Sequence, residues 1–371
     1  MKKYFTLLFV SFSFLSFAQN MTNTPFGKGL INVYAKDSSW TTKVAFRFQS
    51  RYDGTYDFSD SSFSDKAYVR RARIKGSGNV FNPKISYKFE YDVANGYVLD
   101  AVLKWNFAGN WTVWFGQTKL PGNIERVFSS QKLQLVDRSL LNSRFTLDRD
   151  AGFQLRHHFK IGKNFIVREK FAVSQGEGLN QTGTSTGNGY TARLELLPFG
   201  KFTGKGDYFA SDLKREKTPK LMLSLTYDYN DNASRSRGQK GDYMIGTLRD
   251  LQNIQADAHF KYKGVSFFGE YANRKVMGGS PVNELNEVYY TGSALNLQAG
   301  YLFKNNWELA GRFTQLNPEN VTGFNNVNQY TLGFSKYVVG HNLKIQGDIG
   351  ITQEANKDDL LLIRLQTEFN F

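Results

Sequence analysis

The chain has 371 residues, a formal net charge of +14 and no cysteine, so neither disulfide bonds nor thiolate metal sites can hold its fold together. Aromatic residues make up 15% of the chain and prolines number only 7, a usage that favours β-strands joined by turns. The basic charge indicates anionic partners.

The N-terminus has the pattern of a secretory signal peptide. Lys2 and Lys3 precede an apolar run from Tyr4 to Phe17, and cleavage is predicted after Ala18. The run is shorter than the roughly 20 apolar residues of a transmembrane helix, and no run of that length follows it. Because export excludes nucleic acid, the expected partners are small anionic solutes and the lipopolysaccharide phosphates of an outer membrane.

Residues 19–371 are expected to form a single domain of strands, because sixteen segments alternate apolar and polar residues with a period of two. An even number of strands is typical of a closed barrel whose two ends both lie in the periplasm. The mean hydropathy of −0.46 fits such a barrel, in which every second residue faces water, but it also fits a soluble β-sandwich. In chain order, the predicted strands are residues 40–52, 66–79, 84–95, 97–107, 111–118, 150–160, 164–174, 189–198, 219–230, 251–263, 264–275, 291–303, 306–316, 327–338, 342–353 and 359–371.

The last segment shows the alternation most clearly. Ile363, Leu365 and the terminal Phe371 fall on one face, while Arg364 and Glu368 fall on the other. An aromatic final residue on an alternating last strand resembles the signal by which outer-membrane barrels are recognised for assembly; an ordinary edge strand is the alternative. We therefore expect an all-β transmembrane antiparallel barrel in the outer membrane of a Gram-negative bacterium.

The links between the predicted strands alternate in length, as they do in barrels with short periplasmic turns and longer outer loops. The short links, expected in the periplasm, are residues 80–83, 108–110, 161–163, 304–305 and 339–341. The long links, expected outside, are residues 53–65, 119–149, 175–188, 231–250 and 276–290. Two links break the rule, since the outer link near Gly96 is short and the periplasmic link 199–218 is long.

Most basic side chains of the predicted strands, including Lys104 and Lys170, fall on the face opposite the apolar one, which in a barrel faces the lumen. An excess of positive charge in a narrow channel concentrates anions. The alternative is that these cations pair with neighbouring carboxylates and with loop acids such as Asp137 and Asp148. Arg70 falls on the lipid side unless it lies near the membrane interface or a bulge shifts its register. The candidate residues of the lumenal anion pathway are Arg47, Arg71, Arg73, Lys75, Lys88, Arg156, Arg168 and Arg312.

Segment 119–149 is too long for a simple turn and mixes cations with apolar residues such as Ile124 and Leu133. This mixture predicts an amphipathic third outer loop that folds into the lumen and narrows it, while a solvated outer loop is the alternative. Its candidate constriction residues are Lys119, Arg126, Lys132, Arg138 and Arg144.

The four histidines are His157, His158, His259 and His341, and none lies in a metalloprotease motif or at motif spacing from a nucleophile. The sequence also has no nucleophile-elbow motif and no phosphate-cradling glycine motif. We therefore expect no catalytic residue, no metal site and no cofactor, and the chain is not expected to be an enzyme.

Most of the chain after the predicted signal peptide resembles the phosphate-selective porin O and P family. The resemblance is strongest over residues 66–160 and rests on Tyr68 to Lys75 (YVRRARIK), Phe89-Glu90-Tyr91-Asp92, Leu99-Asp100-Ala101, Phe115-Gly116-Gln117-Thr118-Lys119-Leu120-Pro121 and Arg149-Asp150-Ala151-Gly152. It implies a sixteen-stranded barrel, usually a trimer, in which lumenal cations guide anions and lysines of the constriction loop bind phosphate. The matching positions are Arg71, Arg73 and Lys119.

Together these features predict a porin through which small anions, phosphate among them, diffuse passively through a basic lumen. Fold analogy alone does not fix the solute. A non-selective diffusion porin and a structural or adhesive surface barrel remain the alternatives.

Overall fold

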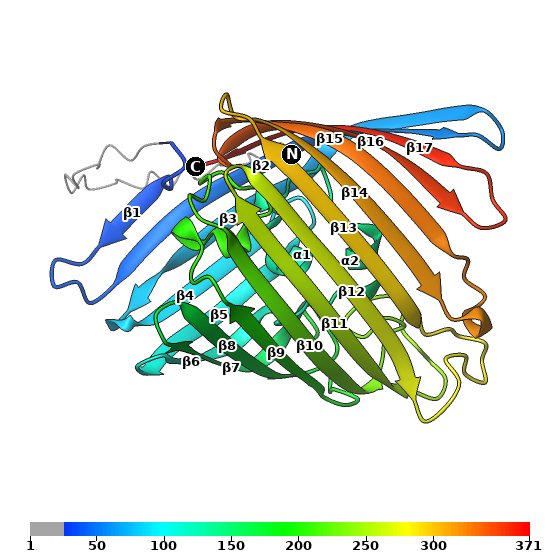
Figure 1. The fold of residues 1–371 in the computed structure, drawn as a ribbon. Helices are drawn as coiled ribbons and strands as arrows, with labels where there is room; N and C mark the ends of the chain where they lie inside the picture. The colour runs from blue at the N-terminus through cyan, green and yellow to red at the C-terminus, as the bar shows by residue number, and fades with distance from the viewer. Residues whose placement is uncertain (1–25) are drawn as a thin grey trace, which may run out of the picture.

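The computed structural model describes residues 26–371, which form one antiparallel sheet with short helical segments in its links (Figure 1). The predicted signal peptide, residues 1–18, lies outside the described residues. The strands are β1 (Ile31–Tyr34), β2 (Thr41–Asp57), β3 (Ser62–Val80), β4 (Asn82–Asp92), β5 (Tyr97–Ala108), β6 (Trp111–Lys119), β7 (Arg149–Ile161), β8 (Phe165–Ser174), β9 (Gly189–Leu197), β10 (Lys220–Ala233), β11 (Arg249–Tyr262), β12 (Val265–Met277), β13 (Gly292–Leu302), β14 (Trp307–Pro318), β15 (Val327–Val339), β16 (Leu343–Glu354) and β17 (Leu360–Asn370). The helical segments are α1 (Ile124–Val127), α2 (Leu140–Phe145), η1 (Ser130–Lys132), η2 (Thr203–Tyr208) and η3 (Asn320–Thr322).

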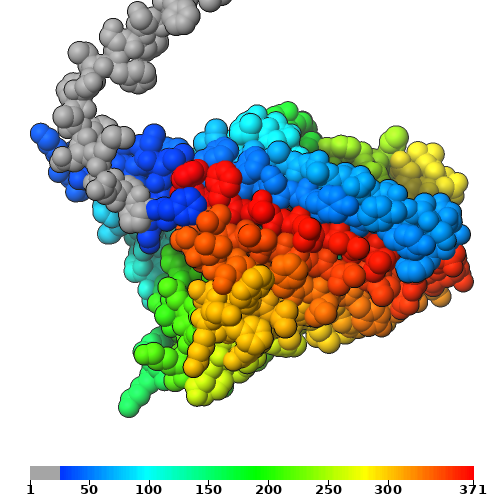
Figure 2. All heavy atoms as spheres, turned by 90° about the horizontal axis from the view of Figure 1, so that it is seen from above, coloured from blue at the N-terminus to red at the C-terminus, as the bar shows by residue number. Residues whose placement is uncertain are grey.

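The sheet closes on itself, because β2 to β16 each pair with the next strand and β17 pairs with β2. Phe369 lies opposite Phe48 across this seam, and Figure 2 shows the first and last strands side by side. The barrel therefore has sixteen strands, and each of the sixteen predicted segments is one of them. The short β1 was not predicted; it pairs only with the start of β2, where Ile31 lies opposite Val44.

The barrel is apolar outside and polar inside. Along β10, Leu223, Leu225 and Tyr227 are exposed, whereas Ser224 and Thr226 between them are buried. This arrangement is the reverse of a soluble sandwich and is typical of a membrane barrel, whose outer face contacts lipid. Among residues 26–371, no helix has the length and apolar character needed to cross a bilayer.

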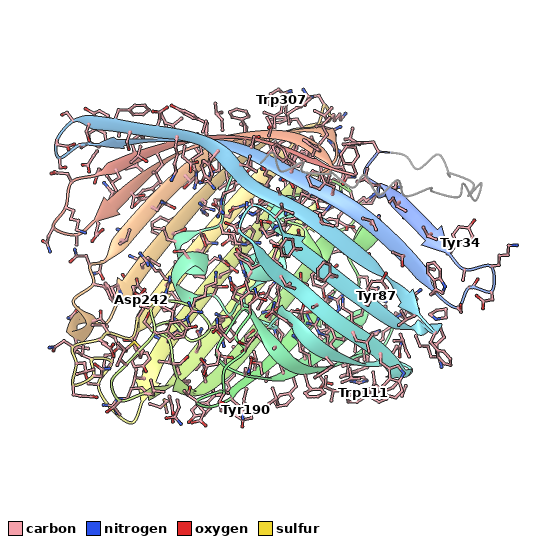
Figure 3. The ribbon with its side chains drawn as sticks, turned by 180° about the vertical axis from the view of Figure 1, so that it is seen from behind. Tyr34, Tyr87, Trp111, Tyr190, Asp242 and Trp307 are labelled. Carbon is pink, nitrogen blue, oxygen red and sulfur yellow. The ribbon has the colours of Figure 1, made fainter. Side chains whose placement is uncertain are left out.

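Aromatic side chains gather on the outer surface near one end. Trp111 stacks on His157 with ring centroids 4.0 Å apart, and Trp307 lies 5.9 Å from Phe334. Trp111 and Trp307 point outward from the barrel wall, and Tyr190, at the start of β9 and toward the opposite end, does so too (Figure 3). Such rings are typical of the membrane–water interface, where an amphipathic ring contacts both media.

The two ends of the barrel differ in their links. We call the end where Phe26 contacts Phe371, with ring centroids 5.4 Å apart, the terminal end, and the other the loop end. The links at the terminal end are short, except for residues 198–219. The long outer link predicted at 53–65 is wrong in length, because β2 and β3 remain paired as far as Asp57 and Ser62.

The two longest links contact each other. Ile124 and Phe128 of segment 120–148 share one apolar cluster with Phe202 of link 198–219, and this cluster rests on Met222 and Phe268 of the wall. The backbone amide of Ala210 also donates to the carbonyl oxygen of Lys132 at 3.0 Å. The wall therefore holds both segments as one packed unit.

Two facing glycines allow close approach of neighbouring strands, of β6 to β5 at one and of β7 to β8 at the other. Gly116 lies opposite Gly152 and has a φ of +117°. A Cβ atom on Gly116 would lie 2.2 Å from the carbonyl oxygen of Ala101, and one on Gly152 would lie 2.2 Å from that of Val173. Only glycine fits these positions, which gives a physical reason for two of the residues in the family-like motifs.

Candidate functional site

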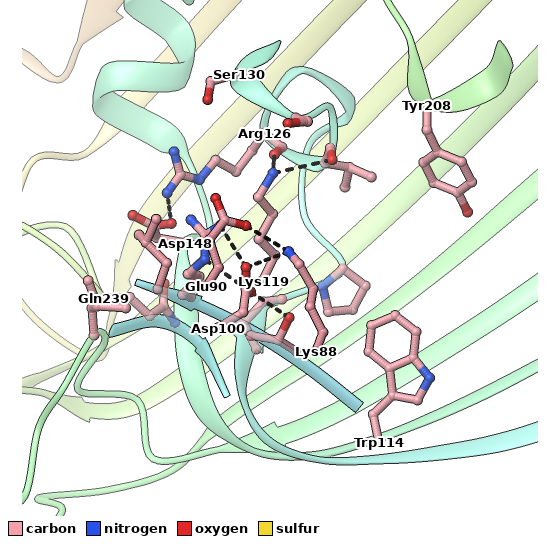
Figure 4. A pocket seen from close by; sticks show the side chains of 18 of the residues that line it. Lys88, Glu90, Asp100, Trp114, Lys119, Arg126, Ser130, Asp148, Tyr208 and Gln239 are labelled. Carbon is pink, nitrogen blue, oxygen red and sulfur yellow. Dashed lines mark hydrogen bonds and ion pairs between the residues drawn. The ribbon is translucent and has the colours of Figure 1, made fainter. Parts of the chain in front are cut away.

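A cavity of about 1410 Å³ lies against β3 to β8 and is bounded by segment 120–148, loop 234–248 and link 198–219 (Figure 4). Seventeen lysine and arginine side chains line it, against six aspartates and glutamates. The cations are Arg70, Arg71, Arg73, Lys88, Lys104, Lys119, Arg126, Arg138, Arg149, Arg156, Arg168, Lys170, Lys201, Lys205, Arg235, Arg237 and Lys240.

The structure brings together eight of the thirteen residues proposed from sequence. Those lining the cavity are Arg71, Arg73, Lys88, Lys119, Arg126, Arg138, Arg156 and Arg168. Those lying outside its lining are Arg47, Lys75, Lys132, Arg144 and Arg312.

The residues outside the lining make other contacts. Arg47 is fully buried and donates to Glu368 at 2.6 Å and to Ser130 of the long loop at 2.8 Å. Arg312 donates to the backbone oxygen of Asp137 at 2.8 Å. These two arginines therefore attach segment 120–148 to the wall instead of facing the cavity.

The other three residues outside the lining make contacts of a different kind. The ammonium group of Lys132 lies 4.6 Å from the Phe209 ring centroid, and Arg144 lies over Tyr290 at 5.5 Å. Lys75 donates to Asn370 at 3.3 Å. Each of these cations thus contacts a neutral partner away from the cavity.

Carboxylates compensate many of the wall cations. Lys88 lies 3.0 Å from Glu90 and 2.6 Å from Asp100, and Arg149 lies 3.1 Å from Asp100. Arg73 contacts Glu90 at 2.9 Å. The pairing anticipated as the alternative thus occurs in the middle of the cavity, while the lining as a whole keeps its positive excess.

A β-bulge turns Arg70 toward the cavity. The register of β2 and β3 shifts between the pairs Gln49–Arg71 and Ser50–Val69, which leaves Arg70 unpaired in the ladder. Arg70 consequently reaches 3.6 Å from Asp137 of the loop. This bulge removes the conflict that strict alternation created for Arg70.

Asp137 is the carboxylate on which the arginines of β2 and β3 converge. Its oxygens lie 2.5 Å from Arg51, 3.6 Å from Arg70 and 3.8 Å from Arg71. Burial opposes its ionisation, but these arginines outweigh burial and hold the pKa of Asp137 well below its usual range. Asp137 therefore stays charged and anchors the middle of the loop to β2 and β3.

Lys119 is engaged by the loop that follows it. Its ammonium group donates to the carbonyl oxygens of Arg126 at 2.7 Å, Val127 at 3.3 Å and Phe128 at 3.0 Å (Figure 4). These are the carbonyls at the C-terminal end of α1, where a cation is favoured by the helix dipole. These three hydrogen bonds tie the end of α1 to Lys119, the last residue of β6.

Sequence reasoning missed the cations that the links contribute. Arg235, Arg237 and Lys240 come from loop 234–248, and Lys201 and Lys205 come from link 198–219. Alternation assigns a face to strand residues alone, because links have no period from which to assign one. The dense basic run between residues 235 and 240 is the signal that could have identified the first group.

The chain thus has an outward apolar face, an inward polar face and a large cationic cavity, and this combination defines an outer-membrane porin. It belongs to the phosphate-selective porin O and P family, which it matches over residues 42–369. An uncharacterized protein from Aquifex aeolicus (strain VF5) is 25% identical over 383 residues, covering 89% of this chain and 87% of that protein.

Two solved structures are similar in fold. The anion-selective porin from Comamonas acidovorans has a TM-score of 0.60 at 9% identity, covering 90% of this chain and 100% of that one. The outer membrane channel DcaP of Acinetobacter baumannii has a TM-score of 0.56 at 13% identity, covering 92% of this chain and 100% of that one. At these identities the likeness establishes the barrel fold alone.

Proposed function

We propose that this porin passes small anions, phosphate among them, by passive diffusion and without a chemical step. The observation that carries the proposal is the lining of the cavity, where seventeen cations face six carboxylates. Low-dielectric walls focus the field of such an excess, which attracts anions and repels cations. The anion-selective porin from Comamonas acidovorans, which has a similar fold, supports a preference for anions by analogy of fold.

We further propose that segment 120–148 lies in the lumen and confines the path to the cavity beside it. Its contacts support this, because the backbone amide of Val136 donates to Asp348 on β16 at 2.9 Å. Ser335 on β15 donates to the Gln134 carbonyl at 2.7 Å, and Glu270 on β12 accepts from the segment at 2.7 Å. The segment leaves β6 and is thus tied to strands far around the barrel, on their polar faces.

The proposed passage exchanges water of hydration for guanidinium and ammonium donors at successive points. A charge-assisted hydrogen bond is strong. The ion can leave each contact only if a neighbouring group weakens that bond. The compensated cations in the middle of the cavity would meet this need, because Glu90 and Asp100 weaken the hold of Lys88 on an anion. In this proposal the barrel is a homotrimer in a Gram-negative outer membrane, with its terminal end in the periplasm.

A planar bilayer under a potassium chloride gradient tests the proposal. We expect the sign of the zero-current potential to show that chloride is more permeant than potassium. No preference would instead support a non-selective diffusion porin, and a barrel without conductance would support a structural or adhesive role. Block of the chloride current by inorganic phosphate tests the preference for phosphate.

A further inference from the structure

Cations at the terminal end of the cavity differ from those in its middle. Trp114 on β6 lies opposite Lys104 on β5 and Gln154 on β7. The Lys104 ammonium is 4.0 Å from the Trp114 ring centroid, and the Arg156 guanidinium carbon is 3.6 Å from it. A tryptophan therefore stands beside two cations that come from the strands on its two sides.

Neither cation is neutralised by an ion pair. Across residues 26–371, the salt bridges give no carboxylate within pairing distance of Lys104 or Arg156. Arg156 is instead oriented by a neutral group, since its Nη2 and Nε donate to the Gln154 side-chain oxygen at 2.6 and 3.2 Å. Gln154 is itself fixed by donating to the Lys119 carbonyl at 2.9 Å. The neighbouring Lys170, by contrast, pairs with Glu195.

A third cation approaches from the link. Lys205 lies on η2, is exposed, and lines the same cavity as Lys104 and Arg156. Lys205 and Arg156 are both near enough to repel the Lys104 ammonium electrostatically, whereas Asp100 attracts it without forming an ion pair with it. Lys205 has a left-handed φ of +61°, a conformation that costs a residue with a side chain some energy and is often retained at functional sites. Tyr208 of the same segment projects toward the space beside Trp114 in Figure 4.

We propose that Lys104, Arg156 and Lys205 form a binding site for a small dianionic oxyanion, with Trp114 holding the first two cations in place. Converging positive charge that no carboxylate pairs with directly is relieved by an anion that carries more than one negative charge and several acceptor oxygens. The aromatic ring stabilises both cations without neutralising them. This inference rests on the proposed anion pathway. It adds the place along that pathway where a divalent anion is bound.

The test is block of the chloride current by inorganic phosphate in a planar bilayer, comparing the wild type with the double variant Lys104→Gln/Arg156→Gln. Removing two charged donors is expected to raise the half-blocking phosphate concentration about tenfold or more. The preference for chloride over potassium is expected to weaken with it, because both side chains are among the cations that line the cavity. The matched control is Lys336→Gln, because Lys336 lies 5.3 Å from the Trp307 ring centroid on the outer face. This control is expected to behave as the wild type.

If the double variant does not assemble, the single variant Lys205→Gln tests the same site. The Lys205 side chain is exposed and lies outside the strands, so its replacement should not prevent assembly. It is expected to weaken phosphate block about threefold or more. Unchanged phosphate block in these variants, or a wild type that prefers chloride but is not blocked by phosphate, overturns the site. A wild type without anion preference overturns the proposed function itself.

Discussion

At the scale of single residues, the polar face of this barrel contains two kinds of cation. Some are buried in ion pairs, as Arg47 is with Glu368 at 2.6 Å, with both side chains fully buried. Others face the cavity with a neutral partner, as Arg156 does with Gln154. Position on the strand does not separate the two kinds, because both lie on the same face of the sheet.

The buried pair should contribute to stability. The substitution Glu368→Gln leaves Arg47 as an uncompensated buried charge, which is expected to cost about 3–5 kcal/mol. Urea unfolding of the barrel in detergent micelles, followed by tryptophan fluorescence, measures the change. Glu354→Gln is the control, because Glu354 pairs at 2.7 Å with Lys357, whose side chain is 61% exposed. That change is expected to cost less than about 1 kcal/mol, and equal costs for both variants would contradict the assignment.

Lys119 should act through the loop rather than as an anion ligand. In Lys119→Met, α1 loses three hydrogen bonds to its terminal carbonyls, and the loop is expected to become mobile. Single-channel recordings should then show a larger and noisier conductance in which chloride is still preferred. A quiet channel of unchanged conductance, with phosphate block lost, would identify Lys119 as a phosphate ligand instead.

The sequence could predict the face of a strand residue but not its partner. Arg71 and Arg73 line the cavity, and the period of two is what assigns them to that face. Arg47 and Arg312 are on the same face, yet both are buried by contacts distant in sequence. Arg47 contacts Glu368 on β17, and Arg312 contacts Asp137 of segment 120–148. The bulge at Arg70 is a feature that no alternation rule can place.

At the scale of elements, the two longest links form one packed unit. Phe202 of link 198–219 is almost completely buried against Phe128 and Ile124 of segment 120–148. The link was identified from sequence as an exception to the short-turn rule, but its contacts were not predicted. Burial of its apolar residues explains its length, since a short turn could not reach this cluster.

Phe202→Ala should loosen both links at once. Removing a buried phenyl ring is expected to cost about 3–5 kcal/mol and to raise the single-channel conductance, because the two links then pack less firmly. Phe199→Ala is the matched control in the same link, since Phe199 is 48% exposed; its cost is expected to stay within about 0.5 kcal/mol. Equal conductance in the two variants would mean that link 198–219 does not border the conducting path.

Strand existence was the most predictable property of the elements. All sixteen barrel strands follow from alternation, since one face contacts lipid and the other does not. β1 was missed because its four residues are too few to show a period. The β2–β3 hairpin was underestimated because polar and acidic residues near Asp57 read as a loop, although backbone pairing continues through them.

For the barrel as a whole, anion selectivity requires that the polar, cation-bearing face of the sheet line the conducting path. The chain has no cysteine, so a single introduced thiol reports on one position alone. Thr112 lines the cavity, and Phe115 on the same strand is 56% exposed on the outer face. The variants Thr112→Cys and Phe115→Cys therefore probe opposite faces of β6.

Exposure of both variants to charged methanethiosulfonate reagents during bilayer recording is the most direct measurement. We expect Thr112→Cys to lose current on modification, with an anionic reagent reacting faster than a cationic one of similar size, and Phe115→Cys to be unaffected. Faster reaction of the cationic reagent at Thr112→Cys, or loss of current only in Phe115→Cys, would contradict a cation-lined lumen enclosed by an apolar outer wall.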